Sequence, residues 1–74
     1  MVVQAVLVNK KYYSPVEAEI IARHFGKPMK VAHTTQKYYR YRMRNPKDFD
    51  ATSFRTLKRP GQKGVRIIIG DLNG

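Results

Sequence analysis

Residues 37–44 have the sequence KYYRYRMR, in which apolar and cationic side chains alternate. Successive side chains of a β-strand point to opposite sheet faces, so one face would carry Tyr39, Tyr41 and Met43 and bury them against a core. The opposite face would carry Tyr38, Arg40, Arg42 and Arg44. Arginines two residues apart lie roughly 7 Å from one another and repel, so the segment predicts a cationic stripe on a rigid strand with an anionic partner.

The whole chain is strongly basic. Its 74 residues include 15 Lys and Arg against 5 Asp and Glu, a formal net charge of +10. Residues 37–74 hold ten basic and three acidic side chains, net +7, so most of the excess lies in the second half. Because such a charge concentrates polyanions around a protein, we expect an acidic macromolecular partner, either nucleic acid or the acidic surface of a protein.

Length and composition restrict the architecture. A chain of 74 residues forms one domain, residues 1–74, with one small core. It contains no cysteine, which excludes a disulfide framework and a thiolate zinc site. No apolar run approaches the roughly 18 residues that a membrane span needs, and residues 1–8 lack the basic region and cleavage site of a secretory signal. We therefore expect a cytoplasmic protein without a membrane partner.

The clearest local pattern is SPVE at residues 14–17. Its serine and glutamate can form a capping box, and its proline suits the first helical position. We expect a helix over residues 15–25 that ends at Gly26. Its apolar face is expected to comprise Ala18, Ile21, Ala22 and Phe25, widened by Val16 and Ile20.

β-Branched and alternating segments predict the strands. We expect them at residues 2–8, 37–44, 54–58 and 64–69, with a brief extended segment at 29–33, an ordered loop at 46–52 pinned by Phe49 and a turn at 60–63. The order indicates a small α+β domain in which one amphipathic helix packs on a three- to four-stranded, mainly antiparallel sheet. The other sheet face would be free.

That free face is the predicted binding surface. Arg40, Arg42 and Arg44 would be joined there by Arg55 and Arg59 from a neighbouring strand, and the surrounding rim would be basic as well. The expected partner- or nucleic-acid-binding residues are Tyr38, Arg40, Arg42, Arg44, Arg55, Lys58, Arg59, Lys63 and Arg66.

Arginines pair with phosphates and tyrosines can stack on bases, so the composition also suits a single strand of nucleic acid. The alternative is that the tyrosines are half-buried core residues and the arginines a solvated face, and for Tyr39 and Tyr41 we prefer the core. Some arginines are also candidates for pairing with Asp48 or Asp50 within the fold. No sequence motif of a nucleic-acid recognition module is present.

Catalytic patterns are weak. Asp48 and Asp50 lack a third ligand, His24 and His33 belong to different elements, and PGQKG at residues 60–64 does not fit the spacing of a phosphate loop. We expect no enzyme, with no catalytic site, metal, cofactor or small-molecule substrate.

Four segments resemble a short module found in bacteriophage and prophage proteins: YRYR at 39–42, NPKDFD at 45–50, SFRT at 53–56 and GVRIIIG at 64–70. The module has the pattern YxRxR, PxxF, SFRT, GVxxxxG, and it follows a helix opening similar to residues 13–18. The resemblance covers about residues 12–70 and implies a viral origin, without a defined activity. This chain departs from the module in having residues 20–23, IIAR, where tryptophan is common, and in being far more basic.

Two functions suit a small, basic, phage-like protein. The preferred one is a regulator that binds nucleic acid or a host machine that handles it, such as RNA polymerase, and so modulates transcription. The alternative is an accessory protein of virion head assembly that binds an acidic scaffold or packaged DNA. The sequence leaves open whether the protein is a monomer or a dimer.

Overall fold

The central element of the structure is β1 (Val2–Asn9), whose middle residues Ala5 and Val6 are fully buried. The computed structural model describes residues 1–29, 33–59 and 61–73. Within these ranges β1 pairs antiparallel with β3 (Tyr38–Arg42) on one side and with β5 (Val65–Gly70) on the other. A strand with a neighbour on each side and apolar residues at most positions forms the middle of the sheet.

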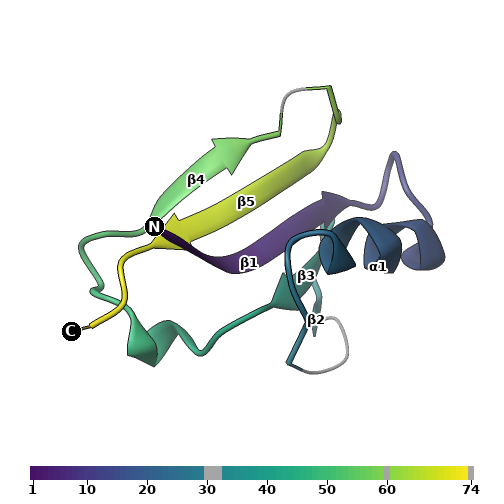
Figure 1. Cartoon of the computed structure of the whole chain (residues 1–74). Coiled ribbons are helices and arrows are strands. Elements are labelled where there is room, and N and C mark those ends of the chain that lie inside the picture. Colours follow the sequence, from purple (N-terminus) through teal and green to yellow (C-terminus); the bar gives the residue numbers. More distant parts are fainter. Residues whose placement is uncertain (30–32, 60, 74) are drawn as a thin grey trace.

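Two short strands complete the sheet. β2 (His33–Thr34) pairs with β3, and β4 (Arg55–Lys58) pairs with β5, giving the antiparallel order β2-β3-β1-β5-β4 (Figure 1). The predicted α+β class is confirmed, whereas the predicted number of strands is wrong, because the described residues form a sheet of five. The brief extended segment predicted at residues 29–33 overlaps β2 only at His33, because two exposed residues show no alternation. The predicted segment 29–33 and turn 60–63 fall partly outside the described residues.

The helix α1 (Pro15–Arg23) begins with the predicted capping box. The backbone N–H of Glu17 donates to Ser14 Oγ at 3.3 Å, and the N–H of Ser14 donates to Glu17 Oε1 at 3.1 Å. The helix ends two residues earlier than expected and packs on β1 and β3. The prediction that Val16 and Ile20 belong to its buried face is wrong, since their side chains are 69% and 56% exposed. Within the described ranges the helix packs mainly on β1 and β3, so its buried stripe is narrow.

The core lies between α1 and one sheet face. Val6 lies opposite Tyr41, and Val8 lies between Tyr39 and Val65, so all share the face that α1 covers. Tyr41 is buried and its hydroxyl donates to the carbonyl oxygen of Pro15 at 3.5 Å. Burial, followed by the charge of Glu19 and the nearby Tyr39, raises the pKa of Tyr41. The predicted core role of Tyr39 and Tyr41 is confirmed.

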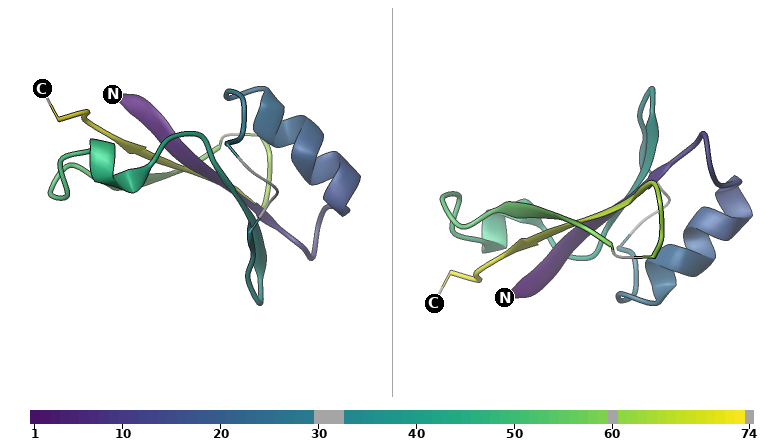
Figure 2. Two further views of the ribbon diagram at one scale, coloured as in Figure 1. Left: turned by 90° about the horizontal axis from the view of Figure 1, so that it is seen from below. Right: turned by 90° about the horizontal axis from the view of Figure 1, so that it is seen from above.

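A second apolar cluster closes one end of the opposite sheet face. Phe49 follows the short 3₁₀ helix η1 (Pro46–Asp48), is 3% exposed and lies 5.5 Å from the Phe54 ring. A Cβ on Gly70 would lie 2.9 Å from Phe49 Cδ2, which places the ring against the side of β5 that faces away from α1. In both views of Figure 2, α1 and the η1 segment lie on opposite sides of β1. The predicted loop pinned by Phe49 is confirmed, but the second face is free only beyond this loop.

β3 is shorter than the predicted strand because the register of β1 shifts at Gln4. The N–H groups of Met43 and Arg44 both donate to the carbonyl oxygen of Gln4, at 2.8 and 3.3 Å. The buried Gln4 side chain donates from Nε2 to the carbonyl oxygen of Arg44 at 2.9 Å. This irregularity ends the ladder at Arg42.

Candidate functional site

One row of side chains crosses all five strands on the sheet face opposite α1. From β4 to β2, the register aligns Lys58, Arg66, Leu7, Arg40 and His33. Directly opposed residues share a face and neighbouring strands lie about 4.8 Å apart, so the row extends over about 19 Å. We call its polar members, Lys58, Arg66, Arg40 and His33, the cationic row, whose three charged side chains are Lys58, Arg66 and Arg40.

A second line of side chains crosses the cationic row along β3. Tyr38, Arg40 and Arg42 occupy alternate positions and therefore share the open face. Tyr38 lies opposite Asn9, and Arg42 lies opposite Ala5. Arg42 thus lies nearer the end of the face that the phenylalanine cluster closes, and Tyr38 lies nearer the opposite, basic end.

Arg40 stands where the two lines cross. It is half-buried, and its Nε is buried without a hydrogen-bond partner among the described residues. A buried donor without an acceptor costs about 1–3 kcal/mol. Arg40 is therefore the member of the row whose polar group the protein itself satisfies least.

No acidic side chain of the described residues forms an ion pair with the cationic row. The one ion pair within these ranges joins Arg23 to Glu19 on the outer surface of α1, at 3.1 Å. Asp50 Oδ1 accepts hydrogen bonds from the N–H and hydroxyl of Thr52, which lower the pKa of this carboxyl. The predicted pairing of arginines with Asp48 or Asp50 is wrong for the part of the chain that the structure describes. The positive charge of the row is not neutralised by these residues.

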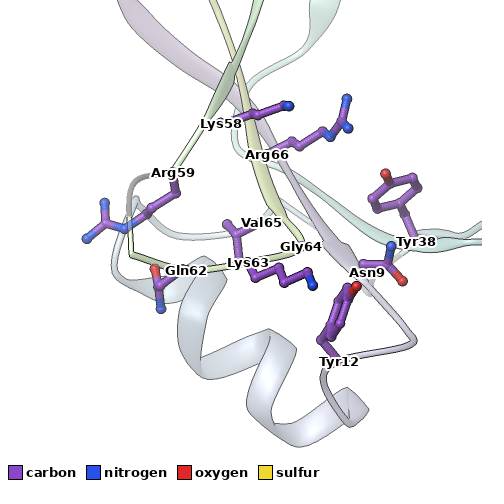
Figure 3. A pocket seen from close by; sticks show the side chains of 10 residues that line it. All are labelled: Asn9, Tyr12, Tyr38, Lys58, Arg59, Gln62, Lys63, Gly64, Val65 and Arg66. Carbon is purple, nitrogen blue, oxygen red and sulfur yellow. The ribbon is translucent and has the colours of Figure 1, made fainter.

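A pocket of about 340 Å³ opens where the cationic row meets the β4–β5 connection (Figure 3). Lys58 and Arg66 of the row line it, together with Tyr12, Tyr38 and Lys63. All of its lining side chains are neutral or basic. A neighbouring hollow shares Asn9 and Tyr12 with this pocket and adds Lys10, Lys11 and Lys37. This end of the sheet therefore carries a continuous basic surface.

Tyr12 forms part of the pocket wall and packs on Gly64. Gly64 has φ 84°, and a Cβ at this position would lie 2.6 Å from Tyr12 Cδ2, so the ring packs directly on the glycine backbone. Lys63 Nζ lies 5.1 Å from the centroid of the Tyr12 ring and Lys11 Nζ lies 5.8 Å from it. Cations within about 6 Å of an aromatic face are attracted to it, so the ring attracts Lys63 at the pocket and Lys11 at the neighbouring hollow.

Five of the predicted site residues are brought together on the open face: Tyr38, Arg40, Arg42, Lys58 and Arg66. Lys63 borders the pocket beside them. The placement of Arg55 and Arg59 on this face is wrong. Arg55 lies opposite Ile69 on the α1 side of the sheet, and the guanidinium of Arg59 lies 4.7 Å from the centroid of the Phe25 ring. Arg59 still lines the pocket, but Figure 3 shows its guanidinium turned away from Lys63 and Arg66.

Arg44 also lies apart from the predicted stripe. The irregularity at Gln4 places it beyond the end of β3, where it lines a hollow with Phe25 and Met43 on the α1 side. The stripe therefore contains two arginines of β3, and its other cations come from β4 and β5.

Sequence reasoning did not place His33 or Tyr12 at this surface. His33 gave no usable pattern because its strand has only two residues. Tyr12 could have been suspected from Gly64, since a glycine between Lys63 and a buried strand allows close approach of another side chain.

The described residues contain no group of three or more His, Asp or Glu side chains placed to hold a metal ion. In the same ranges no helix is long and apolar enough to cross a membrane. Comparisons of the chain with known protein families, with curated proteins and with solved structures found no match.

Proposed function

We propose that this protein is a small basic regulatory protein that binds nucleic acid directly, with the cationic row contacting the phosphates. The observation that carries the proposal is the alignment of Lys58, Arg66, Arg40 and His33 across the sheet, without an ion pair to any acidic side chain of the described residues. The phage-like pattern of the sequence suggests the cytoplasm of an infected host as the setting.

The spacing of the cationic row suits a nucleic-acid backbone that runs across the strands. Side chains on adjacent strands are separated by about 4.8 Å, and Leu7 leaves a wider gap between Arg66 and Arg40. Guanidinium groups bind phosphate through paired hydrogen bonds, and the affinity comes largely from release of counterions. Contacts of this kind carry little sequence information, so the proposed binding is insensitive to base sequence.

The first prediction concerns the salt dependence of binding to a fluorescently labelled oligonucleotide. With four to six phosphate contacts, log K should fall against log salt with a slope of about −3 to −5. Replacing Arg40, Arg42 and Arg66 together by alanine removes three contacts and should make the slope shallower by about 2 to 3 units. Fluorescence anisotropy at several salt concentrations measures both quantities.

A charge-matched control separates the row from net charge. Lys27, Lys47 and Arg55 are exposed and belong neither to the cationic row nor to the line along β3, so replacing all three by alanine removes the same charge elsewhere. This variant should keep most of the wild-type slope. A shallow slope for the wild type, or equal loss in both triple variants, would contradict the proposed interface. Recovery of RNA polymerase from nuclease-treated host lysate by a protein that binds no oligonucleotide would identify a protein partner instead.

A further inference from the structure

The pocket of Figure 3 shares two residues with the cationic row. Lys58 and Arg66 occupy the β4 and β5 end of the row and also line the pocket. A nucleic-acid backbone whose phosphates follow the row therefore brings the nucleotide at this end of the row to the pocket mouth. A base entering there meets tyrosine rings within a surface that is otherwise polar and basic.

Tyr38 is the tyrosine best placed to receive a base. It is half-buried, lies on the open face two residues from Arg40, and lines the pocket. The rings of Tyr39 and Tyr41 pack in the core, and the Tyr12 ring is approached by Lys11 and Lys63. Among the described residues the structure shows no cation over the Tyr38 ring. Figure 3 shows it standing across the pocket from the β4–β5 connection.

Tyr12 and Lys63 form another part of the pocket wall. Tyr12 rests on Gly64 and keeps Lys63 Nζ 5.1 Å from its ring centroid, at the edge of the pocket. Lys63 is thus positioned to contact the phosphate of a nucleotide whose base enters the pocket. The cavity volume of about 340 Å³ lies at the lower end of the range of small-molecule pockets.

We propose that this pocket takes one base of a single-stranded nucleic acid, stacked on Tyr38, and so gives the protein a preference for single strands over duplexes. The inference rests on the proposed function and specifies its ligand. A paired base would have to leave its duplex before entering, whereas a base in a single strand is already accessible. Stacking tolerates any base because every base has an aromatic face.

The test compares a single-stranded oligothymidylate of about ten nucleotides, an abasic strand of the same length and a matched duplex. The wild type should bind the oligothymidylate about tenfold more tightly than the abasic strand, because stacking of one base contributes roughly a factor of ten. Tyr38→Leu should bind both strands equally, and Tyr38→Phe, which keeps the aromatic ring, should retain the wild-type difference. Circular dichroism verifies folding of both variants.

The outcomes separate the two proposals. Equal wild-type affinity for base-bearing and abasic strands, with a steep salt slope, would overturn the base pocket while leaving phosphate binding in place. Tighter binding of the duplex would overturn it as well. Failure of every strand to bind would overturn both proposals. The abasic comparison uses the wild type alone, so it decides the question even if Tyr38→Leu does not fold.

Discussion

At the scale of single residues, the basic pocket depends on the absence of a side chain at Gly64. Its φ of 84° is unfavourable for other residues, and a Cβ would lie 2.6 Å from Tyr12 Cδ2 and 3.1 Å from Asn9 Cβ. We expect Gly64→Ala to lower the free energy of unfolding by about 1–3 kcal/mol and to displace the Tyr12 ring. Chemical denaturation measures the loss.

Gly61→Ala is the matched control for this prediction. Gly61 has a similar φ of 78°, but a Cβ there would meet no atom within 4 Å. Its substitution therefore reports backbone strain alone, and the difference between the two variants reports the contact with Tyr12. Equal stabilities would show that the close approach of Tyr12 to Gly64 contributes nothing.

The sheet face of a side chain was predicted correctly where the sequence of a single strand determines it. The alternation along residues 38–42 assigns Tyr38, Arg40 and Arg42 to one face without knowledge of any partner. For Arg55 the face depends on its pairing with Ile69, which only the assembled sheet fixes. The position of Arg44 depends on the irregularity at Gln4 of another strand, and no local pattern reveals it.

At the scale of elements, α1 is defined by its first turn. Ser14 Oγ accepts from the N–H of Glu17 and the Glu17 carboxylate accepts from the N–H of Ser14, which satisfies two donors of a nine-residue helix. We expect Ser14→Ala to lower the free energy of unfolding by about 1 kcal/mol. Ser14→Asp keeps a capping acceptor and should lose only a few tenths of a kcal/mol at neutral pH. If both variants lose the same amount in urea denaturation, the cap is not what stabilises this turn.

The same helix shows why an element is easier to predict than its packing. Caps and turns depend on adjacent residues, so the sequence of residues 14–17 was sufficient. The width of the buried stripe depends on what lies opposite, and among the described residues no element beyond β1 and β3 covers Val16 or Ile20. For the same reason the closure of one end of the open face could not be predicted. It depends on the contact between Phe49 and Gly70, which are far apart in sequence.

At the scale of the whole molecule, the unneutralised charge should weaken the fold at low ionic strength. The net charge is +10, and the molecule measures only 36 × 25 × 22 Å. At 0.01 M salt the Debye length is about 30 Å, so nearly all pairs of cations repel, whereas at 0.15 M it is about 8 Å. We therefore expect the melting temperature to rise as sodium chloride increases over this range, because screening relieves repulsion in the folded state.

The triple variants locate that repulsion. If it is concentrated at the cationic row and along β3, replacing Arg40, Arg42 and Arg66 by alanine should reduce the salt-dependent rise more than replacing Lys27, Lys47 and Arg55, which belong to neither line. Thermal melts of the wild type and of both triple variants are compared at the two salt concentrations. The two variants carry the same net charge. Arg40, Arg42 and Arg66 would then both destabilise the free protein and contact phosphate. An oligonucleotide at low salt should therefore raise the melting temperature of the wild type more than that of the variant that lacks these three arginines. An identical salt-dependent rise in all three proteins would show that the repulsion is spread evenly and that the open face holds no special share of it.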